Sequence, residues 1–447
     1  MSMQAPAKVP TWDLSADPAI GEAMHAFIAE LYPICRSITG DGVRETLRRV
    51  GAHIPLTVQE VPTGTPAYDW TVPKEWNIRY AWVKNASGEK VVDFQRSNLH
   101  VLNYSVPVHK RVSLGELKQH LFSIPEHPDW TPHRTSYYNE TWGFCLPHRE
   151  LLALEDGEYE VFIDSTLAPG NLTYAECFLP GDSEEEVLIS THTCHPSLCN
   201  DNLSGIAVAT FLAKRLAEFP RRYSYRFLFA PSTIGSIVWL SRNEEKIGRI
   251  KHGLVLTCLG DDGGFTYKRS RRGAEIDRAA ELVLKHSGKH WKVLDFYPYG
   301  YDERQYCSPG FNLPIGLFMR TQHGCFPEYH SSADNLDFVK PGALAESYAH
   351  ILSVLHVVEA NRTYLNLNPK CEPQLGRRGL FRVIGGHGAP NMETALLWVL
   401  NFSDGEHSLL DIAEKSNLPF ESIKHAADVL AAHGLLREER QPKGREL

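Results

Sequence analysis

The feature that most constrains the fold is an alternation of short apolar strands with helical segments between residues 185 and 345. The predicted strands are EEVLIST, YRFLFAP, GLVLTCLG and LPIGLFMR, and helices are predicted over 205–219, 234–246 and 274–287. Each strand is apolar along its whole length, as strands are when helices cover both faces of a sheet. The alternation therefore predicts an α/β fold with a mostly parallel sheet and helices on both faces.

The regions on either side have different patterns. Residues 18–50 show helical apolar spacing, broken by a turn-rich stretch, and predict a pair of helices. From about 55 to 180, short runs rich in Val, Ile, Tyr, Trp and Phe predict β-structure. Segments 391–401, 408–416 and 419–434 predict three short helices in a winged-helix pattern. The expected domains are a catalytic α/β domain over 1–58 and 155–370, an inserted β-rich domain over 59–154, and a winged-helix domain over 376–447.

Composition limits the possible classes of function. The chain has 447 residues and a formal net charge of −8, so its overall charge attracts neither nucleic acid nor an anionic membrane. No apolar run reaches the roughly 18–20 residues that cross a bilayer, and the start of the chain lacks the pattern of a secretion signal. Nine cysteines in so long a chain form no disulfide framework. A cytoplasmic location is expected.

Four polar residues each come directly after an apolar strand: His192, Ser232, Asp261 and Arg320. In open α/β sheets, ligand sites lie at the carboxyl ends of the strands. The segment THTCHPSLCNDNLSG at 191–205 also follows a strand, and it brings His192 and His195 near Asp201. Such groups are costly to bury unless they are coordinated. Because hydrolytic zinc sites use neutral imidazoles and carboxylates, we expect a zinc site here.

The sequence also resembles a known family. The stretch NDNLSG at 200–205, after a strand-terminal histidine, resembles the motif of the co-catalytic zinc aminopeptidase clan. The chain is similar to a branch of bacterial aminopeptidases with an inserted β-rich domain and a C-terminal winged helix. The same resemblance is carried by RSITG at 36–40, DWTVPKEWNIR at 69–79, SYYN at 136–139, WGFC at 142–145 and DERQY at 302–306. It implies a zinc aminopeptidase-like catalytic domain with zinc as the cofactor.

The resemblance also implies a set of ligands. It gives His192 as a ligand, Asp201 as a ligand able to bridge two ions, and Asp261 as a further ligand. The last implied ligand is His330, in the stretch PEYHSSAD at 327–334. His195 is a rival to His192, because both lie in the same turn.

One position departs from the family pattern. After the strand YRFLFAP the family pattern resembles PETIGS, in which the Glu is a general base or a ligand, but this chain has Ser232 in its place. A hydroxyl cannot take a proton from metal-bound water at neutral pH, and general-base help is worth on the order of 10²–10⁴ in rate. Three readings stay open: another carboxylate has taken over, Ser232 is an engineered inactivating change, or the chain binds a ligand without hydrolysing it. For the first reading, Glu303 ranks before Asp262 and Glu328.

Other residues are candidates for contact with a substrate. Arg320 and Tyr329 are candidates to stabilise an oxyanion. Arg269, in the basic run 267–273, and Arg304 could bind a substrate carboxylate or phosphate. An aromatic cluster in the insertion forms either a core or the wall of a binding site: Tyr137, Tyr138, Trp142 and Phe144.

The leading hypothesis is a zinc-dependent aminopeptidase or small-amide hydrolase acting on a small aminoacylated or peptide-like substrate. The resemblance implies relatives in polysaccharide or natural-product biosynthesis, which favours a small metabolite. The alternative is a catalytically silent ligand-binding or regulatory protein on the same scaffold. DNA binding is disfavoured, because Lys424 is the only Lys or Arg in the predicted helix 418–433, although basic residues follow in 437–445. We expect the winged helix to make packing or subunit contacts in a homo-oligomer.

Overall fold

The computed structural model describes residues 12–380 and 390–439. These residues form two compact units, one from the chain up to 274 together with 290–349, and one from 275–289 together with the chain from 350 onward. Parts of the predicted ranges 1–58, 376–447 and 437–445 lie outside the described residues.

The first unit is built on an eight-stranded sheet. In spatial order its strands are β1 (Thr57–Pro62), β10 (Asn171–Leu179), β12 (Ser224–Ala230), β11 (Glu186–His192), β13 (Ile250–Leu256), β16 (Ile315–Met319), β14 (Phe265–Lys268) and β15 (Trp291–Leu294). The four strands from β12 to β16 are parallel, whereas β10 and β14 are antiparallel to their neighbours β12 and β16. The sheet is therefore mixed: the predicted parallel arrangement holds for its centre and for the edge pair of β14 and β15, but not for the other pairs. Apolar patterning gives no strand direction, so it could not predict the antiparallel flanks.

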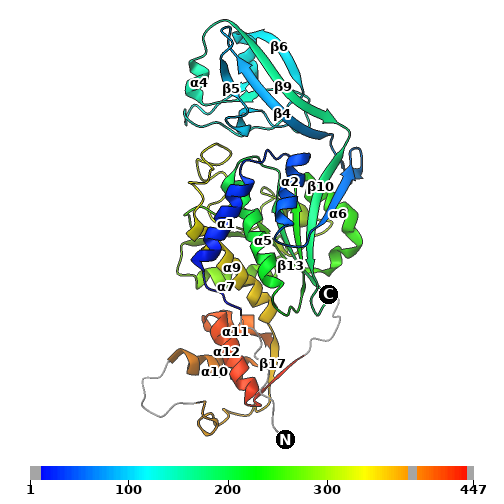
Figure 1. Cartoon of the computed structure of the whole chain (residues 1–447). Helices are drawn as coiled ribbons and strands as arrows, with labels where there is room; N and C mark the ends of the chain where they lie inside the picture. Colours follow the sequence, from blue (N-terminus) through cyan, green and yellow to red (C-terminus); the bar gives the residue numbers. More distant parts are fainter. Residues whose placement is uncertain (1–11, 381–389, 440–447) are drawn as a thin grey trace. The chain divides into compact units, whose positions relative to one another are not determined.

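Helices cover the centre of this sheet. They are α1 (Pro18–Leu31), α2 (Asp41–Val50), α5 (Ser204–Leu216), α6 (Ile234–Asn243), the 3-10 helix Glu244–Arg249, α8 (Glu303–Tyr306) and the start of α9 (Pro341–Ala360). All residues of β11 are buried, as expected for a strand covered on both faces. Leu188 and Val255 share a core with Ile237 of α6, while α5 contacts β11 and β13 and lies beside α1 (Figure 1). The prediction of an α/β fold is confirmed.

The same unit contains a four-stranded antiparallel sheet (Figure 1). Its strands, in spatial order, are β5 (Lys90–Asp93), β4 (Glu75–Lys84), β9 (Glu158–Ala168) and β6 (Val108–Ser113). Short elements accompany it: β2 (Pro66–Ala67), β3 (Trp70–Thr71), the 3-10 helices Asn98–His100 and Lys118–His120, α3 (Leu114–Leu117), β7 (Leu121–Phe122), β8 (Phe144–Cys145) and α4 (His148–Leu152). Ala81, Val161 and Phe144 belong to its separate core. Since β9 is followed almost at once by β10, the chain passes directly from this sheet into the large one.

The second unit contains the winged helix. Its elements are α7 (Glu275–Lys285), the end of α9, β17 (Thr363–Asn366), the 3-10 helix Gly376–Arg378, α10 (Pro390–Phe402), β18 (Asp404–Ser408), α11 (Leu409–Ser416), α12 (Phe420–Ala432) and β19 (Leu436–Glu438). The strand order is β18, β17, β19, with antiparallel pairing. The three helices predicted here are confirmed.

Helix α11 begins with a capping box, which gives a first testable prediction. The Ser408 side chain accepts a hydrogen bond from the Asp411 amide at 3.2 Å, and Asp411 accepts one from the Ser408 amide at 2.7 Å. Replacing Ser408 by alanine should destabilise α11 by about 1 kcal/mol. Hydrogen exchange of the α11 amides in the full chain should accelerate, whereas Ser408→Asn should keep the slower exchange. Unchanged exchange in the alanine variant would contradict the prediction.

A buried histidine in β13 predicts a loss of stability in mild acid. Burial, together with the smaller effect of the neighbouring Arg222, Arg272 and Lys251, lowers the pKa of His252 to about 3. Below its unfolded pKa near 6.5, His252 takes a proton in the unfolded chain but not in the folded one, so stability is lost as the pH falls. Between pH 7.5 and 5.5 the loss should be about 1.4 kcal/mol. Urea unfolding of zinc-free protein at both pH values measures this loss of stability. In His252→Phe the loss should be smaller by that amount. Equal losses in the variant and the wild type would refute the assignment to His252.

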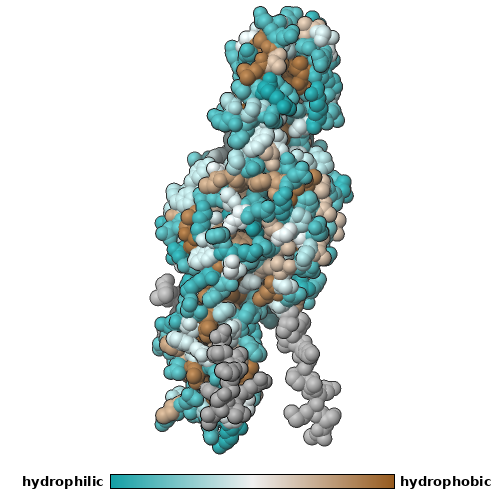
Figure 2. Space-filling view, turned by 90° about the vertical axis from the view of Figure 1, so that its left-hand side faces the viewer, coloured by the Kyte–Doolittle hydropathy of each residue, from teal (hydrophilic) through white to brown (hydrophobic). Residues whose placement is uncertain are grey.

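None of the helices within the described residues is both long and apolar enough to cross a bilayer. On the face drawn in Figure 2, hydrophobic residues form separate patches among hydrophilic ones. Scattered apolar residues of this kind are normal on a protein surface.

Candidate metal centre

The candidate centre lies at the carboxyl end of β11. His192 is the last residue of this strand, and Asp201 lies in the one-turn π-helix Cys199–Leu203 that precedes α5; both side chains are fully buried. His192 Nε2 is 2.9 Å from Asp201 Oδ1. The strand end and the helix start thus bring together two residues that are nine positions apart.

Buried polar side chains hold the loop that carries Asp201. Asp334 accepts hydrogen bonds from the backbone amides of Asn200 at 2.5 Å and Asp201 at 2.9 Å. The Asn202 side-chain amide donates to the hydroxyl of Thr191 at 2.8 Å. Burial raises the pKa of Asp334 to about 8, although these backbone amides lower it. The position of Asp201 is therefore fixed from both sides of its loop.

Two further imidazoles surround the Asp201 carboxylate. His330 Nε2 is 2.9 Å from Asp201 Oδ2, and His195 Nδ1 is 3.8 Å from the same oxygen. His195 Nδ1 also lies 3.1 Å from His192 Nε2. His192, His195 and Asp201 offer ligand atoms that all lie within 4.8 Å of one another. The structure thus brings His192 and His195 together, where sequence reasoning had treated them as rivals.

The electrostatics of this cluster favour a charged Asp201 carboxylate and a neutral His195 ring. Burial raises the pKa of Asp201, but the neighbouring His195, His192 and His330 outweigh it, and the net pKa lies well below its ordinary value. Burial holds the pKa of the His195 imidazole well below its usual range. A charged carboxylate and a neutral imidazole are the forms that coordinate a metal ion.

Tyr301 and Tyr329 line the same cluster. The Tyr301 ring stacks on His192 with centroids 4.9 Å apart, and its hydroxyl donates to Asp201 Oδ1 at 3.1 Å. The Tyr329 ring stacks on His330 at 4.0 Å, and its hydroxyl lies 3.4 Å from that of Tyr301. Burial raises the pKa of both phenols well above the ordinary value, so both remain hydrogen-bond donors at neutral pH.

Asp261 lies outside this cluster. Its Oδ1 accepts hydrogen bonds from the Thr321 hydroxyl at 2.5 Å and the Gly263 amide at 2.8 Å, and its Oδ2 accepts one from the Asn200 side chain at 3.0 Å. The metal-ligand group found among the described residues does not include it. Here the predicted ligand accepts hydrogen bonds from uncharged donors in neighbouring loops.

Ser232 meets a carboxylate that sequence reasoning did not single out. Its hydroxyl donates to Asp302 Oδ1 at 3.2 Å, and the Ser236 hydroxyl donates to the same oxygen at 2.8 Å. Asp302 is buried, and its Oδ2 has no hydrogen-bond partner within the described part of the chain. Burial raises the pKa of Asp302, and the nearby His192 opposes that shift. A carboxylate therefore does lie beside the position where the family pattern has Glu.

The carboxylates that the sequence offered as replacements for the missing Glu lie in surroundings different from those of Asp302. Glu303 is fully buried in an ion pair with Lys268, with Oε1 and Nζ 2.5 Å apart, and burial raises its pKa. Asp262 is exposed and Glu328 is half-buried. Among these carboxylates, the structure brings only Asp302 into contact with Ser232.

Three predicted arginines have separate surroundings. Arg320 donates to the carbonyls of Gly263 and Ala343, and Arg269 pairs with the exposed Asp295. Arg304 is half-buried beside Asp302, and its Nε has no hydrogen-bond partner among residues 12–380 and 390–439. Of the three, Arg304 is the one placed next to a residue of the candidate centre.

The aromatic cluster of the insertion divides into two parts. Trp142 is buried in the core of the small sheet, where it stacks on His120 with centroids 3.6 Å apart. Tyr137 packs against the core that contains Cys194 of the loop after β11, and the Tyr138 ring lies beside it, with centroids 6.3 Å apart. These two tyrosines can thus contact a ligand near that loop.

Two histidines near the centre were not singled out from the sequence. His133, from the insertion, has its ring centroid 5.2 Å from that of His195 and 5.4 Å from that of His330. His323 contacts the Tyr301 ring at 5.1 Å, and neither of its ring nitrogens has a hydrogen-bond partner in the described chain. Among 21 histidines, no local motif marked these two.

The donor set fits zinc. Imidazole nitrogens and a carboxylate are the usual ligands of a hydrolytic zinc ion. His192, His195 and Asp201 would hold the ion, and His330 can join them through its approach to Asp201.

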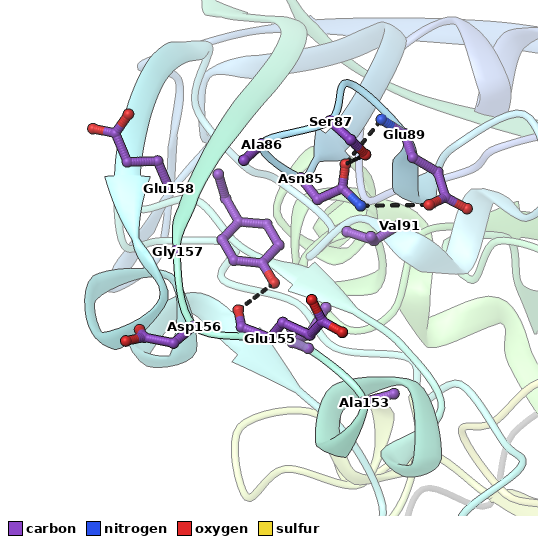
Figure 3. A pocket seen from close by; sticks show the side chains of 12 residues that line it. Asn85, Ala86, Ser87, Glu89, Val91, Ala153, Glu155, Asp156, Gly157 and Glu158 are labelled. Carbon is purple, nitrogen blue, oxygen red and sulfur yellow. Dashed lines mark hydrogen bonds between the residues drawn. The ribbon is translucent and has the colours of Figure 1, made fainter.

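A separate hollow, shown in Figure 3, lies in the insertion. It is lined by the turn between β4 and β5 and by residues 153–159. The side chain of Asn85 bonds with Ser87 and Glu89, and Tyr159 donates to the carbonyl of Glu155. None of its lining residues belongs to the candidate centre.

Comparisons with known proteins agree with this architecture. The family model described as Domain of unknown function (DUF4910) matches residues 25–361, and a winged helix-turn-helix model matches 362–438. A Clostridium acetobutylicum protein, provisionally named a polysaccharide biosynthesis protein with an aminopeptidase-like domain, is 57% identical over 419 residues, covering 93% of this chain and 96% of the relative.

Solved structures give the same result. A crystal structure of a provisionally named peptidase from C. acetobutylicum has a TM-score of 0.91 and 54% identity, covering 94% of this chain and 97% of that one. The zinc aminopeptidase BSAP from Bacillus subtilis has a TM-score of 0.58 at 11% identity, covering 78% and 96%. At that identity the second likeness establishes the fold alone, which is that of a zinc aminopeptidase.

Proposed function

This chain belongs to the family of the domain of unknown function DUF4910, and we propose that it is a zinc-dependent hydrolase of aminopeptidase type. The observation that carries the proposal is the buried group of His192, His195 and Asp201, approached by His330, at the carboxyl end of the central sheet. The fold shared with a zinc aminopeptidase supports it. The proposed substrate is a small aminoacylated or peptide-like molecule whose amide bond is cleaved.

Zinc, when bound, supplies a Lewis acid and an activated water. Tyr301 orients the site by donating to Asp201 Oδ1 and stacking on His192. Tyr329 keeps its proton and can donate a hydrogen bond to a developing oxyanion. We assign to Asp302 Oδ2 the role of accepting the proton that the attacking water releases and of passing it to the leaving amine, because this carboxylate lies beside Ser232. Burial raises its pKa above the ordinary value of a carboxyl, which favours a base.

The test combines metal analysis with an assay. Zinc content of the purified chain is measured by elemental analysis, and hydrolysis is measured on a panel of aminoacyl amides, with and without Ser232→Glu. We expect bound zinc and turnover. A zinc-free protein, inactive in both forms, would overturn the proposal.

A second candidate function is a silent ligand-binding protein on the same scaffold. The hydroxyl of Ser232, where the family pattern has a carboxylate, favours it. In that case zinc would bind, but neither form would hydrolyse any amide of the panel.

The remaining expectations from sequence belong to this proposal. We place the catalytic domain at 1–58 and 155–370, the insertion at 59–154 and the winged helix at 376–447, in a cytoplasmic homo-oligomer. Lys424 pairs with Asp428 at 2.6 Å, and this neutralising contact disfavours DNA binding by the winged helix.

A further inference from the structure

The inserted β-rich region sends one histidine to the candidate metal centre. His133 is 6% exposed, and its Nε2 has no hydrogen-bond partner in the described part of the molecule. Leaving a buried polar nitrogen without a partner costs free energy, so such an atom calls for an explanation. A role as a metal ligand fits its surroundings.

The surroundings of this ring are the imidazoles of the centre. Its ring stands nearly perpendicular to those of His195 and His330, at 85° and 81°, with centroids 5.2 and 5.4 Å away. The centroids of His195 and His330 are 4.9 Å apart. Imidazoles that share one tetrahedral zinc ion, at Zn–N distances of about 2.0–2.1 Å, have centroids about 5 Å apart. The three ring centroids are therefore spaced as those of ligands of one ion would be, whereas the ligand atoms that already lie within 4.8 Å of one another are those of His192, His195 and Asp201.

Backbone pairing fixes His133 against His330. The His133 amide donates to the His330 carbonyl at 2.7 Å, and the Ser332 amide donates to the Thr131 carbonyl at 2.8 Å. Between them Pro132 and Ser331 form an antiparallel bridge. His330 has a φ of +55°, a region that L residues seldom adopt, so the pairing holds its side chain in an unusual direction. The insertion thus sets the positions of both rings.

We propose that His133 is a zinc ligand of this protein, supplied by the inserted region to the centre formed by His192, His195 and Asp201, which His330 approaches. This inference rests on the proposed function, because it takes zinc as the ion. A ligand from the insertion makes that region a part of the metal centre. The affinity for zinc then depends on whether the insertion holds His133 against the centre.

The test measures zinc affinity of the full chain, stripped of metal, by competition with a chromophoric chelator, and the visible spectrum of the cobalt(II) form. His133→Ala should lower zinc affinity about 100-fold or more, which exceeds the usual effect of an outer-shell partner, and should change the cobalt spectrum. His133→Phe retains a buried ring without nitrogen, so it should show the same loss even if the alanine variant folds poorly. His109→Ala, at an exposed histidine of the same insertion paired with Glu160, is the matched control.

Wild-type affinity and an unchanged cobalt spectrum in His133→Phe would overturn this inference alone. A wild-type chain that binds no zinc would instead overturn the proposed function from which it starts. The two failures are therefore distinguishable in one series of titrations.

Discussion

Replacing Asp201 by alanine is expected to lower zinc affinity by more than about 100-fold, beyond the usual cost of losing an outer-shell partner. Asp201 is the carboxylate whose two oxygens each meet an imidazole, at 2.9 Å from His192 and 2.9 Å from His330. Without it the rings share no anion, and a dication bound by neutral ligands alone loses charge compensation. Chelator competition measures the affinity, and elemental analysis measures the bound zinc.

Asp261→Asn is the informative comparison. The resemblance implies Asp261 as a ligand, but in the structure its oxygens accept hydrogen bonds from Thr321, Gly263 and Asn200. Its amide variant should lose stability, because an NH₂ group would then face hydrogen-bond donors, at a cost of about 1–3 kcal/mol. Its zinc affinity should stay within a few-fold of wild type. A loss as large as that of Asp201→Ala would mean that Asp261 turns toward the ion, and the structure-based ligand set would be wrong.

The contrast between these two aspartates shows how far sequence reasoning reaches. Apolar strands and the positions that follow them placed His192 correctly at the end of β11, because strand ends can be read from hydrophobic runs. The same reasoning placed Asp261 after β13 but could not give the direction of its side chain. That direction depends on Thr321 and Asn200, which lie 60 and 61 residues away in the chain.

Local sequence patterns could not predict contacts between distant loops either. His133 and His330 meet through backbone pairing across nearly two hundred residues, and neither loop carries a periodic signal. For another reason, the sequence could not show which of the adjacent carboxylates, Asp302 or Glu303, lies beside Ser232. Successive residues at the start of a helix point about 100° apart, so one faces Ser232 while the other faces Lys268. A shared motif could not decide between them.

The choice between those carboxylates leads to the second large effect. Asp302→Asn is expected to lower kcat/KM by on the order of 10²–10⁴, the usual worth of general-base help. Its zinc content should remain that of the wild type, because Asp302 is not among the ligand atoms of the cluster. The assay uses the aminoacyl amide that the panel identifies, and the exposed Asp262→Asn is the matched control. An Asp302→Asn protein with wild-type kcat/KM would remove Asp302 from the reaction.

A double variant separates lost chemistry from lost structure. The Ser232 hydroxyl lies 3.2 Å from Asp302 Oδ1, so a carboxylate placed at 232 reaches the same neighbourhood. In Ser232→Glu alone, two carboxylates would share this buried region and one of them would be held protonated, which limits any gain. In Ser232→Glu with Asp302→Asn that repulsion is absent, and kcat/KM should recover at least about 10-fold over Asp302→Asn, part of the 10²–10⁴ that a base supplies. If the double variant instead remains as slow as Asp302→Asn while binding zinc normally, the defect is structural, and proton transfer must be sought at another group.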